Sequence, residues 1–385
     1  MFFDAAASAQ PRPTVMEAVM AFMVMYGSIH RGAGERSKES SRAYEEAREE
    51  VKQFLKATDE DAVVQVANTT DGINRLAQIL APQLGGGSVL VSDIEHSAND
   101  LPWRRVARVR RFETPNFKIT AESVDLALSA NSDIRLVAVA GASNITGQIV
   151  DAGAIHEVCQ RHNVPLFFDC SQRAAHAECS LRDCEMLAFS GHKIGAPFGA
   201  GILAGRRSLL ETSHPYVGGG SVVYTTDDKE YHKPAPEGME VGTPNGGGMV
   251  AVAAACREIM RQGYSAIREH DRAVEGWYRQ YMPLHELDVW FLEGTTLVFR
   301  PREGSAKQLS ERLGRLGVEH RFGAFCVYGA VARKMGVDRE SVEQEVLLTG
   351  KLPKEFGALR LSAEHFVGQD TVAEAALCLS MAVKE

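Results

Sequence analysis

The 385-residue sequence contains no block of lysines and arginines. Its 42 basic residues are outnumbered by 50 acidic ones, for a formal charge of −8. Binding to nucleic acid or to an anionic membrane surface generally requires a basic patch, so we expect neither partner. No apolar run reaches the roughly 18 residues of a membrane-spanning helix. The closest candidate, from Met16 to Ile29, is interrupted by Glu17 and Gly27. A membrane-spanning protein is therefore not expected.

Cysteine is scarce and shows no pattern. The seven cysteines are an odd number and lack the spacing of a disulfide framework. Free thiols in a reducing compartment are the simplest interpretation, which favours a cytoplasmic protein. We expect no metal site. The chain also lacks internal repeats, low-complexity segments and a linker rich in Pro, Gly and Ser.

Short apolar runs alternate with helical segments along the first half of the chain. The expected strands are residues 62–67, 89–94, 136–140, 166–168, 186–189 and 202–204. Runs of this length between helices are typical of parallel strands buried on both faces, so we predict an α/β fold. A long helix from residue 251 and alternating strands at 295–300 and 318–322 predict a smaller α+β domain after it.

A lysine follows one of the predicted buried strands, in the sequence Phe189-Ser-Gly-His-Lys193. Burying an ammonium group is costly, and lysines persist at such places where a Schiff base removes the charge. The alternative is an ordinary surface lysine after a strand. Asp169 closes the preceding predicted strand, and the carboxyl ends of parallel strands share one edge of a sheet. Lys193 and Asp169 would then form the pair that pyridoxal phosphate requires, although Asp169 alone could be a helix cap.

Two further segments could serve the same cofactor. Asn68-Thr69-Thr70-Asp71-Gly72 follows a strand and opens a helix, where backbone N–H groups and hydroxyls can bind a phosphate. A simple N-cap explains that segment equally well. His96, after the strand at 89–94, could lie on the cofactor ring or could be a structural histidine.

Eight motifs, in order along the chain, carry a resemblance to one family. They are FFDAAASAQ, SIHRG, NTTDGIN, IEHSANDLPW, SNITG, FDCSQ, FSGHKIGAPFGAGIL and GTPNGGG. The chain resembles the cysteine desulfurase and selenocysteine lyase family, in the class V aminotransferase group of fold-type I pyridoxal phosphate enzymes. This implies a large domain with a mostly parallel seven-stranded sheet at 14–260, and a small α+β domain formed by 1–13 and 261–385.

The resemblance implies a role for each matched residue. Lys193 would hold the cofactor aldehyde, Asp169 its ring nitrogen and Gln172 its phenolic oxygen, with His96 stacked on the ring and also catalytic. The phosphate ligands would be Thr69, Thr70, Ser190, His192 and, from the second subunit of a homodimer, Thr243. The substrate, a small amino acid, would contact His30, Asn144, Arg321 and Arg360, and Asn144 would also bind the cofactor beside its ring.

The specific activity depends on Cys326, in the sequence Arg321-Phe-Gly-Ala-Phe-Cys326. The resemblance implies that Cys326 is the catalytic nucleophile, taking sulfur from L-cysteine as a persulfide, leaving alanine, and passing the sulfur to a possible protein acceptor. Without the resemblance, we would interpret Cys326 as a structural residue. A loop thiol with an arginine nearby is a credible thiolate.

Two departures from the family pattern leave alternatives open. Ala324 and Phe325 stand where many relatives have histidines, and Gly34 replaces the second histidine of the HRG-x-H motif. Another pyridoxal phosphate reaction is therefore the alternative: C–S lyase activity on selenocysteine or a cysteine derivative, epimerisation or transamination. A cofactor-binding regulatory subunit and an α/β binding protein without a cofactor are the remaining alternatives.

Overall fold

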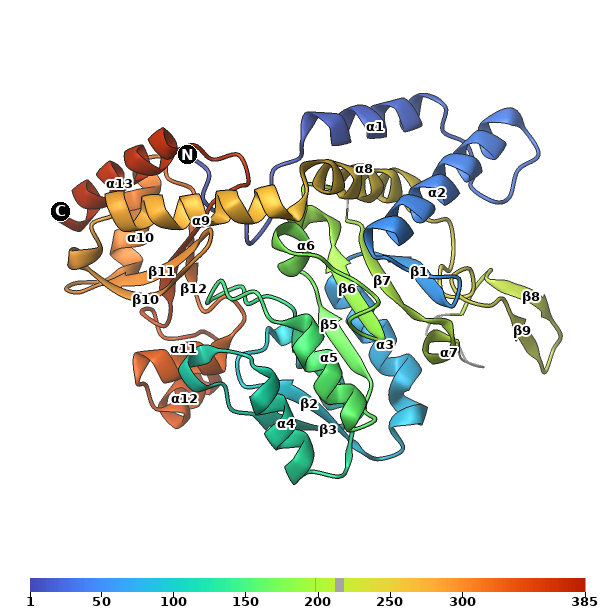
Figure 1. Ribbon diagram of the computed structural model, residues 1–385, viewed down its shortest axis with the longest axis horizontal. Helices are drawn as coiled ribbons and strands as arrows, with labels where there is room; N and C mark the ends of the chain where they lie inside the picture. Colours follow the sequence, from blue (N-terminus) through green and yellow to red (C-terminus); the bar gives the residue numbers. More distant parts are fainter. Residues whose placement is uncertain (198, 212–217, 385) are drawn as a thin grey trace.

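The computed structural model describes residues 1–197, 199–211 and 218–384, so Phe198 of the glycine-rich motif lies outside it. Its largest element is a seven-stranded sheet in the order β1-β7-β6-β5-β4-β2-β3 (Figure 1). The strands are β1 (Asp61–Val66), β2 (Ser88–Ser92), β3 (Arg108–Phe112), β4 (Ile134–Ala140), β5 (Leu166–Asp169), β6 (Met186–Ser190) and β7 (Gly201–Arg206). Only β7 runs antiparallel to its neighbours, β1 and β6. The prediction of a mostly parallel α/β sheet is confirmed.

Helices cover both faces of this sheet, so its central strands are buried on both sides. They are α2 (Glu35–Phe54), α3 (Thr69–Leu84), α4 (Ala121–Ala130), α5 (Ala152–Arg161), α6 (Arg173–His176), α7 (Arg207–Leu210) and α8 (Gly246–Gln262). Helix α1 (Pro13–Val24) packs on the outer side of α8 (Figure 1). Alternate strand residues enter two separate apolar cores. Phe168 of β5 belongs to one, and its neighbour Phe167 belongs to the other. This two-sided burial explains why the strands read as continuous apolar runs.

A second, four-stranded antiparallel sheet in the order β10-β11-β13-β12 lies at the far end of the molecule (Figure 1). Its strands are β10 (Leu287–Glu293), β11 (Thr296–Pro301), β12 (Arg321–Gly323) and β13 (Ala358–Ser362). Helices α9 (Tyr264–Tyr281), α10 (Ala306–Arg315), α11 (Tyr328–Met335), α12 (Arg339–Thr349) and α13 (Gln369–Lys384) accompany it. A small hairpin, β8 (Val222–Thr225) and β9 (Glu230–His232), projects from the opposite end.

The two sheets are joined by helix α9, which continues from α8 after Gly263 and runs across to the second sheet (Figure 1). The N-terminus also reaches that sheet: Phe2 bridges Glu319 and Asp4 bridges Ser362. The domain division at residues 14 and 260 stays a prediction. Within the described residues, none of the helices has the length and apolar character needed to cross a membrane.

Candidate active site

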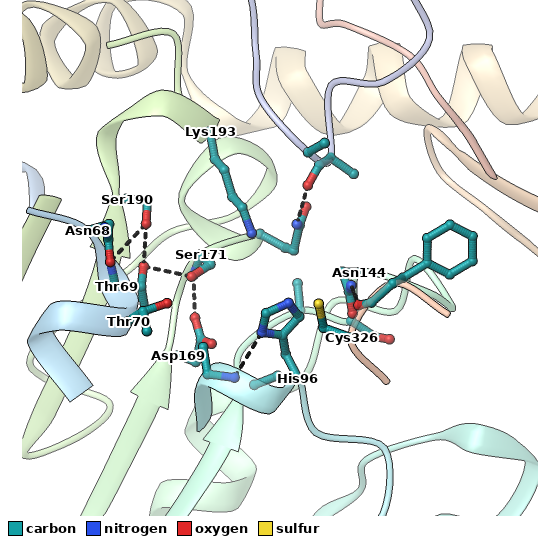
Figure 2. Close-up of a pocket in the computed structure, with 18 of the residues that line it drawn as sticks. Asn68, Thr69, Thr70, His96, Asn144, Asp169, Ser171, Ser190, Lys193 and Cys326 are labelled. Atoms are coloured by element: carbon teal, nitrogen blue, oxygen red, sulfur yellow. Dashed lines mark hydrogen bonds between the residues drawn. The ribbon is translucent and has the colours of Figure 1, made fainter. Parts of the chain in front are cut away.

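A cavity of about 510 Å³ opens at the carboxyl ends of β4, β5 and β6, where the first sheet faces strands β12 and β13 (Figure 2). Its walls include twelve of the residues that the sequence predicted for the site: Thr69, Thr70, His96, Asn144, Asp169, Gln172, Ser190, His192, Lys193, Arg321, Cys326 and Arg360. Residues far apart in the chain converge here because parallel strands end at one edge of the sheet.

Lys193 lies in the short turn after β6, and Asp169 is the last residue of β5. Figure 2 shows the Lys193 side chain extending into the cavity. Burial lowers the pKa of its amine to about 8, although the negative charge of Asp169 opposes this shift. In the described part of the chain, no hydrogen bond or ion pair engages the amine. A buried amine that is partly neutral near pH 8 is suited to nucleophilic attack on an aldehyde.

A cluster of hydroxyls lies at the first turn of α3. Thr69 Oγ1 is 2.7 Å from Ser190 Oγ and accepts a 2.7 Å hydrogen bond from Ser171 Oγ. Asn68 caps the helix by accepting from the Asp71 N–H. Hydroxyls beside a helix N-terminus are well suited to bind a phosphate. Ser171 was not among the predicted site residues, because a serine after Asp169 carries no distinctive signal in the sequence.

His96 occupies the wall of the cavity that faces Asp169 and Lys193. Its Nδ1 accepts a 3.1 Å hydrogen bond from the Ala98 N–H. Burial lowers the pKa of the imidazole, an effect that Lys193 reinforces and Asp169 opposes. The ring is therefore neutral at physiological pH, as an aromatic stacking partner should be.

Glu95, beside His96, is a residue that sequence reasoning missed. Its carboxyl group accepts hydrogen bonds from Ser92 Oγ (2.8 Å), the Ala140 N–H (3.0 Å) and Asn99 Nδ2 (3.0 Å). Burial raises the pKa of Glu95 to about 7. These contacts tie the segment that carries His96 to strands β2 and β4, which fixes the position of the imidazole. The only available signal was an acidic residue directly after the strand predicted at 89–94.

Two arginines line the side of the cavity formed by the second sheet. Arg321 and Arg360 are direct partners in the register of β12 and β13, an arrangement in which like charges repel. Asp4 compensates, because its carboxylate accepts from Arg321 Nη2 (2.9 Å) and Arg360 Nη2 (3.3 Å). Two positive charges and one negative charge leave a net positive charge facing the cavity. Arg360 Nε is buried without a partner in the described residues, and burial lowers the pKa of this guanidinium to about 10.

Cys326 reaches the cavity from the loop after β12. Its carbonyl accepts hydrogen bonds from both the N–H (2.9 Å) and the hydroxyl (3.0 Å) of Ser97, and the Phe325 carbonyl accepts from Asn144 Nδ2 (2.9 Å). Cys326 (φ 58°) and Phe325 (φ 53°) both adopt the left-handed conformation, which is unfavourable for residues other than glycine. The Phe325 ring lies 5.0 Å from the Arg360 guanidinium carbon. The thiol is therefore held at the cavity by contacts to the segments that follow β2 and β4.

The remaining predicted residues divide into two groups. Gln172 and His192 line the cavity. The Gln172 side chain donates a hydrogen bond to the Ala6 carbonyl (2.7 Å), and burial lowers the pKa of His192. His30 and Thr243 are exposed and do not line the cavity within this chain. His30 instead makes a 2.8 Å contact with Glu45 Oε1. The roles assigned to the predicted residues stay predictions.

Known proteins resemble this chain over most of its length. Residues 1–341 match the model of the family "Aminotransferase class-V". A cysteine desulfurase of Synechococcus elongatus is 30% identical over 88% of this chain, which spans 56% of that relative's length. A cysteine desulfurase of Enterobacter sp. is 32% identical, covering 71% of this chain and 70% of the relative.

A solved structure gives the same result at the level of the fold. The crystal structure of the cysteine desulfurase CsdA from Escherichia coli superimposes with a TM-score of 0.84 and 26% identity. The superposition covers 100% of this chain and 94% of that one. The chain belongs to the class V aminotransferase family and, within it, to the cysteine desulfurases.

Proposed function

We propose that the protein is a pyridoxal phosphate-dependent cysteine desulfurase, which converts L-cysteine to L-alanine and transfers the sulfur to Cys326. The observation that carries this proposal is that one cavity contains an amine, Lys193, a carboxylate, Asp169, and the Cys326 thiol. When bound, the cofactor supplies an electron sink for negative charge that develops at the substrate Cα.

The cavity residues fit this cofactor in both chemistry and position. Lys193 would hold its aldehyde, and Asp169 would keep its ring nitrogen protonated. His96, neutral because it is buried, would cover the ring, while Gln172 would reach its phenolic oxygen. The phosphate would be held by the hydroxyls beside α3 and by one imidazole, from Thr69, Thr70, Ser190 and His192.

The arginine pair would hold the carboxylate of an amino-acid substrate. Arg360 is buried, and its unpartnered Nε is a donor that a carboxylate can satisfy. A planar guanidinium binds a carboxylate through two parallel hydrogen bonds, which an ammonium group cannot do. Arg321 adds positive charge, and Asn144 lies between the cofactor position and the Cys326 loop, where it would contact both. Lys193 would then move the Cα proton.

Cys326 would complete the reaction by attacking the substrate sulfur as a thiolate. The S–S bond of a persulfide forms as the Cβ–S bond breaks, and the electron pair of the broken bond stays with Cβ. Proton uptake at the substrate carbon skeleton then gives alanine. The sulfur becomes available to a reducing acceptor, for which a protein is a fitting candidate because Cys326 is exposed.

A homodimer would explain the two predicted residues that lie outside the cavity. Thr243 is exposed just before α8, and the Ile29 side chain, next to His30, lies against Gly246 at the start of that helix. His30 and Thr243 therefore lie in one surface region, from which both could reach the cavity of a second copy. The seven free thiols support a cytoplasmic location.

The experiment that tests this function is incubation of the purified protein with a panel of amino acids, followed by measurement of alanine, sulfide, pyruvate and ammonia. We expect alanine from L-cysteine. Pyruvate and ammonia would indicate elimination, and a keto acid without sulfide would indicate transamination. A Cys326→Ala variant that retains full activity would also select one of these alternatives, because neither reaction requires the thiol.

A further inference from the structure

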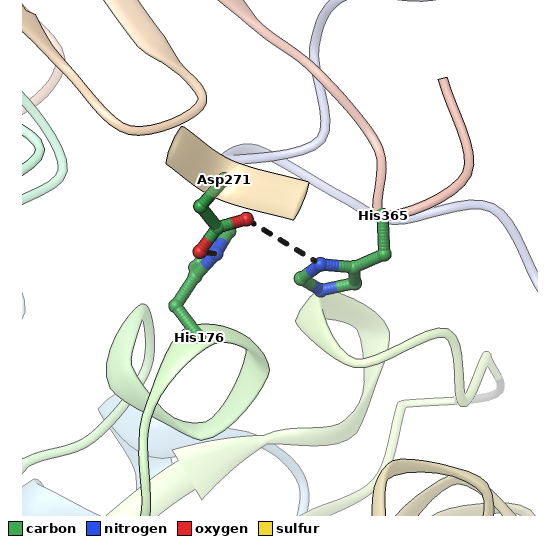
Figure 3. A group of neighbouring side chains, drawn as sticks. All are labelled: His176, Asp271 and His365. Atoms are coloured by element: carbon green, nitrogen blue, oxygen red, sulfur yellow. Dashed lines mark hydrogen bonds and ion pairs between the residues drawn. The ribbon is translucent and has the colours of Figure 1, made fainter. Parts of the chain in front are cut away.

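Three potential metal ligands meet beside helix α9 (Figure 3), and none of them lines the cofactor cavity. His176 ends α6, Asp271 lies in α9, and His365 lies in the segment between β13 and α13. Their ligand atoms lie within 4.8 Å of one another. His176 Nδ1 is 2.9 Å from Asp271 Oδ2, and His365 Nδ1 is 4.0 Å from Asp271 Oδ1. The three side chains come from segments that span almost 200 residues, so no local metal-binding motif is visible in the sequence.

Two atoms of this cluster are buried without hydrogen-bond partners among the described residues: Asp271 Oδ1 and His365 Nδ1. The side chains of Asp271 and His365 are only 8% and 10% exposed. An unsatisfied buried polar atom costs about 1–3 kcal/mol, and more when the group is charged. The two atoms face each other at a distance of 4.0 Å (Figure 3), so a single bound species could satisfy both.

We propose that His176, Asp271 and His365 form a binding site for one divalent transition-metal ion of the zinc class. Two imidazoles and one carboxylate are a common ligand set for zinc, whereas calcium and magnesium prefer oxygen ligands alone. Ligand atoms of a tetrahedral zinc ion lie roughly 3.3 Å apart, from bonds of about 2.0–2.2 Å. Small side-chain rotations would bring the present atoms to that spacing.

The space beside the cluster has room for a water ligand. His176 and Asp271 line a cavity of about 220 Å³, from which a water molecule can supply the fourth ligand. Two arginines and two glutamates also line this cavity, so their charges offset one another: Arg268, Arg272, Glu275 and Glu293.

A metal at this position would connect three parts of the molecule that bear on the active site. Helix α6 begins directly after Gln172, and His365 follows Arg360 by five residues. The third ligand, Asp271, belongs to the helix that joins the two sheets. The ion would therefore fix the second sheet, with its arginine pair, relative to the first sheet and its cofactor residues.

The test uses the holoenzyme in a Cys326→Ser background, so that the exposed thiol cannot bind the metal. The protein is equilibrated by dialysis with micromolar free Zn²⁺, and bound zinc is measured by elemental analysis. We expect one zinc per chain in this parent and a loss of at least tenfold in affinity in His365→Gln and in Asp271→Asn. His285→Gln, which changes an exposed histidine, is the matched control and should retain the zinc.

A second measurement separates metal binding from folding. Zinc should raise the thermal unfolding midpoint of the parent and of His285→Gln, but not that of Asp271→Asn or His365→Gln. Circular dichroism and the visible absorbance of the cofactor show that each variant is folded, and His176→Gln replaces any variant that is not. Absence of zinc binding in the parent, or equal binding in parent and folded site variants, would overturn the proposal. His176 and Asp271 would then form only a hydrogen-bonded contact between α6 and α9, with His365 packed beside them.

Discussion

Replacing Lys193 by methionine should stabilise the cofactor-free protein, even though it abolishes activity. The amine is fully buried, and its pKa falls from an ordinary 10.5 to about 8. Below pH 8 the folded protein therefore holds a charge in a site that disfavours it, and methionine fills similar space without a charge. Each pKa unit corresponds to about 1.36 kcal/mol, so the shift destabilises the wild type by about 3 kcal/mol at pH 7.

The pH dependence of this difference has a definite sign. Because the folded pKa is depressed, the unfolded chain binds more protons between pH 8 and 10.5, and wild-type stability rises with pH in that window. The advantage of Lys193→Met should thus fall from about 3 kcal/mol at pH 7 to about 2 kcal/mol at pH 9 and vanish above the unfolded pKa.

The assay is urea unfolding of the cofactor-free proteins at pH 7 and pH 9, followed by fluorescence and circular dichroism. Lys38→Met, which changes an exposed lysine, is the control and should leave stability unchanged within about 0.5 kcal/mol. Equal stability of Lys193→Met and wild type at pH 7, or a difference that does not fall with pH, would show that the Lys193 amine is well solvated. The physical basis for its reactivity would then be wrong.

Three further predictions concern the other walls of the cavity. Asp169→Asn should retain the cofactor, measured by its visible absorbance. Its rate of alanine formation should fall by at least about two orders of magnitude, because the ring nitrogen is no longer kept protonated. Turnover near the wild-type rate would contradict this. Arg360→Lys should raise KM for L-cysteine about tenfold, or about 1.4 kcal/mol, through loss of the paired hydrogen bonds, and an unchanged KM would place the substrate carboxylate elsewhere. Ser97→Ala removes one of two hydrogen bonds to the Cys326 carbonyl. Amide hydrogen exchange around residue 326 should therefore increase, while the rate of alanine formation falls less than tenfold. Unchanged exchange would show that the hydroxyl does not position the loop.

The strands of the first sheet could be predicted from the sequence when both of their faces are buried. Strands β1, β2 and β6 are buried at every position, and each contains an uninterrupted run of three or four apolar residues. Strand β3 was missed, because three of its five residues are arginines. It lies at the edge of the sheet and pairs with β2 alone. Its other edge is unpaired, so its charged side chains can reach water. The predicted strand at 318–322 is shorter and later in the structure, at Arg321–Gly323.

The same distinction between local pattern and tertiary packing applies to the site residues. Lys193 and Asp169 could be located because each follows an apolar strand, and parallel strands place both at one edge of the sheet. Asp4 could not be found in this way, because its role depends on the pairing of the two arginines across β12 and β13. The anchoring of Cys326 by Ser97 likewise joins residues 229 positions apart. Contacts of this kind depend on tertiary packing, which local sequence patterns do not encode.

The most direct test of the proposed function is to locate the sulfur after a single exposure to L-cysteine. Peptide mass analysis of the wild type should find one extra sulfur on the peptide that contains Cys326, and none on the peptides that contain only the other cysteines. In parallel, Cys326→Ser should still bind L-cysteine and change the cofactor spectrum, while its alanine formation falls by orders of magnitude. Alanine formation by Cys326→Ser at close to the wild-type rate, with no sulfur found on Cys326 in the wild type, would contradict the proposal and assign the enzyme to another pyridoxal phosphate reaction.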